Sequence, residues 1–180
     1  DEDAADFSVG ADFQDDVCLW RRVGAGIAPL VVHAVQVDQV QRQRAVGARA
    51  ALHLTSVGKL FLAADDPQRV RAYATRTGLA GQTRNSITQL PVLERELAKA
   101  GQDGIARDNE ELELGVRCMA AGIYDDQGKL IAGLSISAPA DRLDEGWLPK
   151  LEATAREISV ALGHQVGHTQ ASQATHASSS

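Results

Sequence analysis

The stretch from Gly104 to Ala140 constrains the fold more than any other part of the chain, because it contains three consecutive candidate strands. The run GIARDNEE is extended, GVRCMAAGIY is an apolar strand, and KLIAGLSISA is another strand that follows the turn signal DDQG. Alanine, glycine, serine and cysteine fill positions where strands usually carry β-branched and aromatic residues. Small side chains on one face of a sheet leave room, and we interpret this room as a ligand pocket.

A hairpin centred on Asp126 and Gln127 predicts which residues of the last two strands face each other. The predicted pairs are Tyr124 with Lys129, Ala120 with Gly133, Cys118 with Ser135, and Val116 with Ser137. Residues that face each other share one side of the sheet. One side therefore carries small, weakly polar residues: Val116, Cys118, Ala120, Gly133, Ser135 and Ser137. The other side carries apolar core residues: Met119, Ala121, Ile123, Leu130, Ala132, Leu134 and Ile136.

The rest of the chain supplies two earlier strands and four helices. Strands are expected over residues 17–23 and 25–37, as an antiparallel pair. Helices are expected to begin at Val57, at Asp66–Pro67 and at Pro91, the second ending at Gly78 and the third at Gly101. Asp144 is expected to cap a final helix with the apolar stripe Leu143, Trp147, Leu151, Ala155, Ile158 and Leu162. This order of elements indicates an α+β domain with an antiparallel sheet.

Length and charge restrict the class of protein. The 180 residues suffice for one domain, expected over residues 17–163, with a linker or frayed entry segment at 1–16 and a disordered tail at 164–180. The net charge of -6 argues against nucleic-acid binding by this segment. No apolar run is long enough to span a bilayer, and from the sequence we expect neither a membrane span nor a signal peptide. Cys18 and Cys118 lie far apart, as expected for a reducing cytoplasm rather than a disulfide framework.

The start of the helix at Val57 is a candidate anion site. A helix N-terminus exposes unpaired backbone N–H groups and carries a partial positive charge, which attracts carboxylates and phosphates. The modest side chains of Ser56, Val57 and Gly58 would let an anion approach. The alternative is an ordinary capped helix without a ligand.

Cys118 and Asp108 are the other residues with chemistry to offer. Cys118 is a candidate nucleophile, metal ligand or pocket residue, although a free cysteine is commonly a buried hydrophobic residue. Asp108 opens the acidic run 108–111, and such runs are usually solvated. A metal site formed with His33 or His53 is disfavoured because the histidines show no ligand spacing, so no metal and no cofactor is expected. The sequence has no serine-centred hydrolase motif, and no catalytic residue is assigned.

Three linked motifs resemble a known family. LHLTSVGKLFLA, GLAGQTRNSIT and GIARDNEELELGVRCMAAGIYDDQGKLIAGLSISAPADRL are similar to the effector-binding domain of IclR-type transcriptional regulators, from about Val46 to Gly163. The resemblance implies a GAF-like (profilin-like) fold, a curved antiparallel sheet flanked by helices. It also implies a winged helix-turn-helix DNA-binding domain before Asp1, in agreement with the absence of a starting methionine.

In this family, small carboxylates and aromatic acids bind beside the central sheet and alter operator binding. Carried onto this sequence, the effector-contacting positions are Ser56, Val57, Asp108, Val116, Cys118, Ser135 and Ser137, with the amide of Gly58 added from the helix start. The family often has a smaller pair than Ser56–Val57, and commonly an aspartate where Asn109 stands. The identity of the effector is therefore not carried over.

The leading hypothesis is a non-catalytic, ligand-sensing domain of a cytoplasmic bacterial transcriptional regulator, of the repressor type. It binds a small organic acid and forms a homodimer or a dimer of dimers, and its operator DNA is bound by the N-terminal domain rather than by this segment. One alternative is a GAF-like thiol enzyme that uses Cys118, for which Cys18 is the only partner thiol. Another is a dimerisation module without a ligand.

Overall fold

A six-stranded antiparallel sheet forms the centre of the molecule. The computed structural model describes residues 16–23, 26–33 and 50–165, with side chains described from residue 50 onward. The strands are β1 (Asp16–Val23), β2 (Gly26–His33), β3 (Ala50–Ala51), β4 (Ile105–Asn109), β5 (Val116–Tyr124) and β6 (Leu130–Pro139), in the order β3-β2-β1-β6-β5-β4. The expected antiparallel pair at the start is confirmed as β1 and β2. Residues 34–37 and the expected entry segment up to residue 15 lie outside the described residues, as does 166–180.

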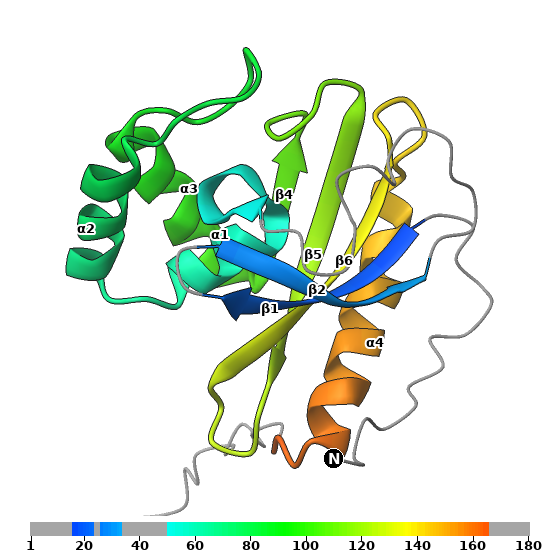
Figure 1. Cartoon of the computed structure of the whole chain (residues 1–180). Coiled ribbons are helices and arrows are strands. Elements are labelled where there is room, and N and C mark those ends of the chain that lie inside the picture. The colour runs from blue at the N-terminus through cyan, green and yellow to red at the C-terminus, as the bar shows by residue number, and fades with distance from the viewer. Residues whose placement is uncertain (1–15, 24–25, 34–49, 166–180) are drawn as a thin grey trace, which may run out of the picture.

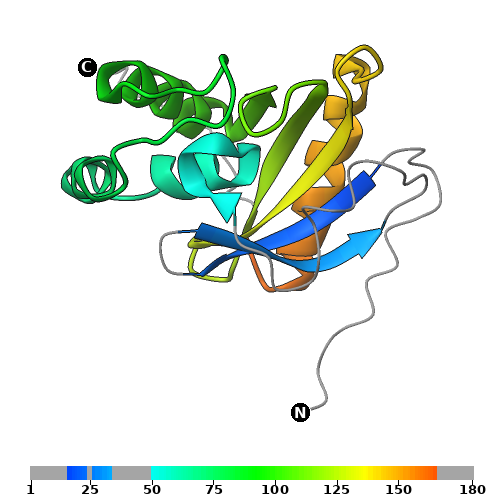
Figure 2. The same cartoon turned by 45° about the horizontal axis from the view of Figure 1, so that its top comes forward.

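Helices cover both faces of this sheet. They are α1 (Ser56–Ala63), α2 (Pro67–Thr77), α3 (Leu90–Asp103) and α4 (Leu148–Ala161), with short 3-10 turns η2 (Leu52–Leu54) and η3 (Glu145–Trp147). Figures 1 and 2 show α1, α2 and α3 on one side of the sheet and α4 on the other. The expected α+β architecture with an antiparallel sheet is confirmed.

Local capping signals explain where α1 and α2 begin and end. The hydroxyl of Thr55 accepts a hydrogen bond from the backbone N–H of Gly58 at 3.1 Å. The carboxylate of Asp66 accepts from the N–H of Gln68 at 2.7 Å, and proline follows it at the first helical position. Gly78 ends α2 with a φ of 63°, a left-handed conformation that glycine adopts without strain. These boundaries agree with the sequence prediction to within one residue.

Two predicted helix features are wrong. Gly101 lies inside α3, which ends instead at Gly104 with a φ of 70°. The carboxylate of Asp144 caps the 3-10 turn η3, after which α4 begins, and Leu162 is 42 % exposed rather than part of the apolar stripe. Neither feature can be read from the local pattern alone. A glycine is compatible with the interior of a helix as well as with its end, and an apolar residue near the end of a helix can be buried or exposed.

The hairpin of β5 and β6 pairs two residues away from the predicted register. Cys118 stands opposite Ser137, and Ala120 stands opposite Ser135. The turn is wider than two residues, because the N–H of Asp125 donates to the carbonyl of Lys129 at 3.0 Å.

A bulge between Ile123 and Tyr124 adds the rest of the shift. Each predicted pair is therefore wrong, but a displacement of two residues keeps every side chain on its side of the sheet. Beyond the bulge this no longer holds: Leu130 packs against the cluster on the α1 side, although the prediction placed it in the core on the other side.

The two faces of the sheet carry separate hydrophobic clusters. On the α4 side the cluster is Ile105, Met119, Ala121, Ile123, Ala132, Leu134, Ile136, Leu151, Ala155 and Ile158. On the α1 side, α1, α2 and α3 pack with the small strand residues Ala106 and Ala120. The small-residue face is thus the face on which α1 lies, and the predicted division into two faces is confirmed except for Leu130.

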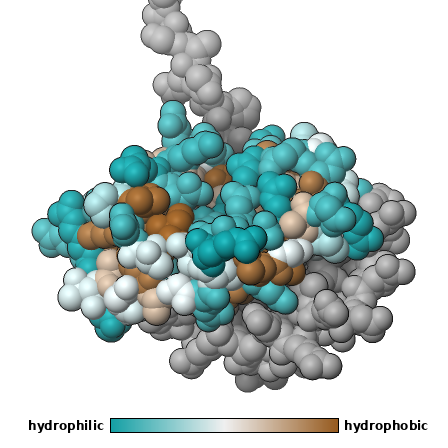
Figure 3. All heavy atoms as spheres, turned by 90° about the horizontal axis from the view of Figure 1, so that it is seen from above, coloured by the Kyte–Doolittle hydropathy of each residue, from teal (hydrophilic) through white to brown (hydrophobic). Residues whose placement is uncertain are grey.

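The surface offers few large apolar side chains. Among the described residues the exposed ones are Val92, Leu114, Ile131, Val160 and Leu162. On the face drawn in Figure 3, hydrophobic side chains form small patches between hydrophilic ones. Within the part of the chain that the structure describes, no helix combines the length and apolar character needed to cross a membrane.

Two helical glycines allow a matched test of this packing. A Cβ on Gly58 would lie 2.2 Å from the carbonyl oxygen of Leu52, whereas a Cβ on Gly101 has its nearest neighbour, the Cβ of Ala63, at 3.8 Å. We expect Gly58→Ala to destabilise the fold by about 1–3 kcal/mol, because backbone cannot move aside. Gly101→Ala should stabilise it by about 0.5–1 kcal/mol. Urea unfolding measures both values, and equal effects would contradict the packing described.

Candidate functional site

The first turn of α1 lies directly on β6. A Cβ on Gly133 would lie 2.5 Å from the Cγ1 of Val57, so only glycine permits this approach. Ser135 is two residues along the same strand and on the same side of the sheet, and it is 3 % exposed. The structure therefore brings the start of α1 close to one of the predicted site serines.

A row of polar residues crosses the sheet next to this contact. Asp108 on β4 stands opposite Cys118 on β5, which stands opposite Ser137 on β6. The Sγ of Cys118 lies 3.0 Å from the Oγ of Ser137. Asp108 and Ser137 are 2 % and 4 % exposed and Cys118 is half-buried, so both ends of this row are buried on the α1 side.

The remaining predicted positions lie around this row. Ser56 begins α1 and is 3 % exposed, while Val116 is half-buried opposite Pro139 at the far end of β5. The N–H of Gly58 is already bonded to the hydroxyl of Thr55, so at the helix start only the amides of Ser56 and Val57 remain for an anion. Gly58 itself is required by the close approach to Leu52.

The acidic run after β4 is not a solvated face, contrary to its usual interpretation. Asp108 and Glu111 are 2 % and 4 % exposed, whereas Asn109 between them is exposed and Glu110 is half-buried. The N–H of Glu111 donates to Oδ1 of Asp108 at 2.7 Å. The chain thus folds back after Asn109 and buries two carboxyl groups.

Lys59 of α1 supplies the cation for this buried region. Its side chain is fully buried, and Nζ lies 2.8 Å from Oε2 of Glu111. Nζ also donates to the carbonyl of Arg107 at 2.7 Å, and Oε2 of Glu111 accepts from the N–H of Asn109 at 3.0 Å. Since β4 is an edge strand, the ion pair occupies backbone groups that a further strand would otherwise bond.

This ion pair has a weak sequence signal. Every residue of α1 from Ser56 to Leu62 is buried, so the helix has no solvated face for a lysine. A buried lysine must be paired, because an isolated charge is costly in an apolar environment. A lysine inside an otherwise apolar helix, together with a downstream acidic run, is the pattern that would have predicted the pair.

Burial also changes the acidity of Asp108. It raises the pKa of this carboxyl from 3.8 to about 6, and the negative charge of Glu111 acts in the same direction. The N–H groups of Glu111 and Leu112 and the charge of Lys59 lower the pKa, but they do not outweigh burial.

His53 is held by other groups and does not serve Cys118. Its Nδ1 lies 2.8 Å from the hydroxyl of Tyr73 and its Nε2 lies 2.9 Å from the carbonyl oxygen of Ala80. Burial lowers the pKa of His53. Across the described residues, no group of three His, Cys, Asp or Glu side chains is arranged to hold a metal ion. Cys18, the possible partner thiol, stands opposite Ser135 on β6, not on a strand adjacent to that of Cys118.

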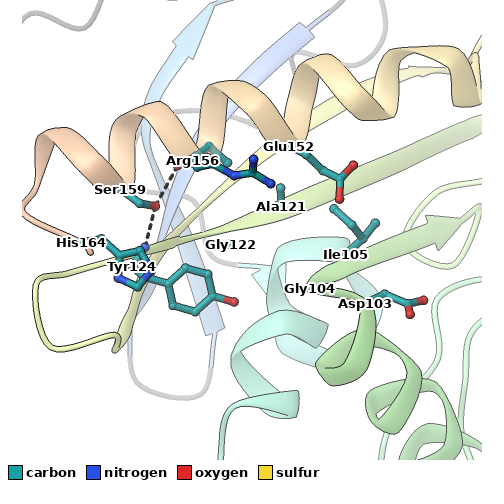
Figure 4. A pocket seen from close by; sticks show the side chains of 11 residues that line it. Asp103, Gly104, Ile105, Ala121, Gly122, Tyr124, Glu152, Arg156, Ser159 and His164 are labelled. Carbon is teal, nitrogen blue, oxygen red and sulfur yellow. Dashed lines mark hydrogen bonds between the residues drawn. The ribbon is translucent and has the colours of Figure 1, made fainter. Parts of the chain in front are cut away.

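A separate hollow of about 210 Å³ lies at the edge of the sheet (Figure 4). It forms where β5 continues past the start of β4, between α4 and the end of α3. Ser159 of α4 completes the strand edge here, because its Oγ accepts from the N–H of Tyr124 at 3.0 Å and donates to the carbonyl of Ala155 at 2.8 Å. His164, expected in the loose tail, lies in this wall with Nδ1 2.9 Å from the carbonyl oxygen of Asp125. None of the predicted site residues lines this hollow.

Comparison with known families decides the identity of the domain. The model for the C-terminal domain of the bacterial transcriptional regulator IclR matches residues 22–162. The chain belongs to this IclR family. Its relatives include the HTH-type transcriptional repressor AllR of Klebsiella pneumoniae, 39 % identical over 124 residues, and that of Salmonella typhi, 36 % identical over 122 residues. Each match covers 66 % of this chain and 45 % of the relative, so the chain spans about half the length of these repressors.

Solved structures of transcriptional regulators, one of them an IclR, share the fold. The C-terminal domain of the E. coli regulator KdgR is 30 % identical with a TM-score of 0.72, covering 84 % of this chain and 89 % of that one. The Thermotoga maritima IclR is 31 % identical with a TM-score of 0.75, covering 84 % and 62 %. A double mutant of the inducer-binding domain of the transcription factor PobR from Acinetobacter, in complex with 3-hydroxybenzoic acid, is 25 % identical with a TM-score of 0.74, covering 81 % and 87 %. The expected GAF-like fold is thereby confirmed.

Removing the buried ammonium tests the role of the ion pair. Lys59→Met leaves the carboxylate of Glu111 and the carbonyl of Arg107 without their cation. We expect the free energy of unfolding, measured with urea, to fall by about 3–5 kcal/mol. Glu111→Gln in the same background should recover part of this loss. Arg71→Met is the matched control: its ion pair with Glu94 is exposed, so the change should stay below about 1 kcal/mol. A loss no larger than that of the control would refute the assigned role.

The raised pKa of Asp108 predicts a pH-dependent stability. Between about pH 4 and pH 6 the folded protein binds more protons at Asp108 than the unfolded chain does, so this carboxyl lowers the unfolding free energy as the pH rises. Asp108→Asn keeps an oxygen for the N–H of Glu111 and cannot ionise. Between pH 4 and pH 7, the free energy of unfolding of the variant, measured with urea, should rise by about 2–3 kcal/mol relative to that of the wild type. Parallel stability curves would contradict the prediction.

Proposed function

We propose that this domain binds a small organic acid and that binding regulates a DNA-binding part of a longer transcriptional regulator. The observation that carries the proposal is the polar row Asp108–Cys118–Ser137 beside the first turn of α1, with Asp108 and Ser137 buried and Cys118 half-buried. A ligand carboxylate would accept hydrogen bonds from the hydroxyls of Ser135 and Ser137 and from the free amides of Ser56 and Val57.

Shape and chemistry support a small ligand. Cys118, Ser135 and Ser137 leave more space than the branched residues of ordinary strands, and Val116 offers an apolar contact at the end of the row. Hydroxyl groups and helix amides select for an anionic acceptor rather than for a hydrocarbon.

The relatives support the same class of function. The inducer-binding domain of PobR shares the fold, and a double mutant of it was solved in complex with 3-hydroxybenzoic acid, an aromatic carboxylate. The AllR relatives carry the name of HTH-type transcriptional repressors. We therefore propose that the regulator as a whole acts in the cytoplasm as a homodimer or dimer of dimers and binds its operator through a helix-turn-helix part outside this chain.

Regulation requires that the two arrangements of such a regulator bind the acid with different affinity. A ligand shifts an equilibrium only by its differential affinity for the two states, and the same coupling makes DNA change the affinity for the acid. The proposed regulator has no catalytic step and needs no cofactor.

A thermal-shift screen of this chain against small aliphatic keto and hydroxy acids and hydroxybenzoates tests the proposal. An acid present at 100 times its dissociation constant adds about 2.7 kcal/mol of stability, or roughly 5–11 °C in melting temperature. Ser137→Ala should lose most of this shift because it removes one hydroxyl donor from the row.

Thr75→Ala is the matched control, since it removes an exposed hydroxyl on α2, which bonds the carbonyl of Arg71. It should keep the full shift. A shift that survives Ser137→Ala unchanged would place the ligand elsewhere, and the absence of any shift across the acids would refute the ligand class.

A further inference from the structure

The site face buries two carboxyl groups against one ammonium. Asp108, Glu111 and Lys59 are 2 %, 4 % and 0 % exposed. The ammonium lies on one oxygen of Glu111, at 2.8 Å, while Oε1 of Glu111 is buried and has no hydrogen-bond partner among the described residues. The buried region therefore carries more negative than positive charge.

The titratable groups near Asp108 come from the elements that pack against β4 and from the segment that follows it: Lys59 from α1, Glu96 from α3, Cys118 from β5 and Glu111 from that segment. The charges of Lys59 and Glu111 also act on His53 of η2. Glu96 is 36 % exposed and lies 3.4 Å from Nζ of Lys59, so it draws on the same cation. His53 adds no second cation at neutral pH, because burial lowers its pKa. Arg107, the neighbour of Asp108 on β4, is engaged with Glu145 at 2.7 Å.

An anionic ligand would make this imbalance worse. Its carboxylate, if bound beside Ser137 and Cys118, would add a negative charge to the row in which Asp108 stands. Like charges in one low-dielectric site cannot all stay ionised, and the group whose charged form is least stabilised takes up a proton. Asp108 is that group, because it has no direct contact with the ammonium and burial already raises its pKa to about 6.

We propose that Asp108 takes up one proton from solvent when the acid binds, and that the resulting carboxylic acid donates a hydrogen bond to the carboxylate of the ligand. This inference rests on the proposed function and assigns Asp108 a role in ligand specificity. The domain then recognises an anion together with a proton. The affinity for the acid should fall by up to tenfold per pH unit above about pH 6, because binding takes up a proton and the concentration of protons falls as the pH rises.

The first measurement needs no ligand. Carbon-13 NMR titration of the aspartate carboxyls should show one group that titrates near pH 6, and this group should be missing in Asp108→Asn. Glu111→Gln should move the same titration to lower pH, because the charge of Glu111 raises the pKa of Asp108. Titration of every aspartate near the ordinary value of about 4 would overturn the inference before any ligand is added.

The second measurement uses pyruvate and 3-hydroxybenzoate as probes in isothermal titration calorimetry at neutral pH, in phosphate and in Tris. These buffers differ in ionisation enthalpy, so the difference in binding heat gives the number of protons taken up. We expect close to one proton per ligand in wild type and close to none in Asp108→Asn, which should still bind and lose its pH dependence.

Asp141→Asn removes an exposed carboxyl by the same chemical change and should behave like wild type. Binding without proton uptake in wild type, or equal uptake in Asp108→Asn, would overturn the inference and leave the proposed function standing. Absence of binding heat for both acids would instead count against the proposed ligand class and, with it, against proton-coupled binding.

Discussion

The buried contact of Lys59 with Glu111 holds the site face together. It joins α1 to the segment after β4, and it bonds the carbonyl of Arg107 and the N–H of Asn109 on the outer edge of the sheet. A strand edge without partners is a liability in water and more so when buried. Because both residues of the pair are needed to satisfy the edge, the position of α1 over the sheet and the position of β4 depend on each other. The ion pair therefore also fixes the position of Asp108, the residue of the polar row that lies on β4.

The small residues of β5 and β6 are explained first by the close packing of α1 on the sheet, whether or not a ligand binds. Gly133 is small because Val57 lies on it, and Gly58 is small because the carbonyl of Leu52 lies against it. With α1 seated this close, the side chain of Lys59 can reach the edge of β4. Space alone is therefore a weak argument for a pocket on this face. The stronger argument is polar: hydroxyl and carboxyl groups are buried beside the half-buried thiol of Cys118, where apolar residues of similar size would stabilise the fold more.

Helix boundaries and strand faces depend on local chemistry and could be predicted, whereas strand pairing and the burial of the acidic residues depend on contacts between distant parts of the chain and could not. Asp66 with Pro67, and the hydroxyl of Thr55, mark helix starts within a few residues of sequence, so these boundaries could be predicted. The faces of β5 and β6 follow from alternation, but their pairing depends on a wide turn and a bulge at Ile123 that the sequence DDQG does not specify. The burial of Asp108 could not be predicted either, because the cation that accompanies it lies some fifty residues earlier in the chain, on α1.

A carboxyl group at position 108 is explained better by a role in ligand binding than by a contribution to the stability of the fold. The hydrogen bonds that Asp108 accepts from the backbone N–H groups of Glu111 and Leu112 require only an acceptor oxygen, and asparagine supplies one without a charge. The ammonium in the region is already bonded to Glu111 and to a backbone carbonyl, so Asp108 does not complete an ion pair. A buried ionisable group with no structural demand for its charge points to chemistry at that position. In a site that receives an anion, the property that distinguishes aspartic acid from asparagine is its ability to gain and release a proton.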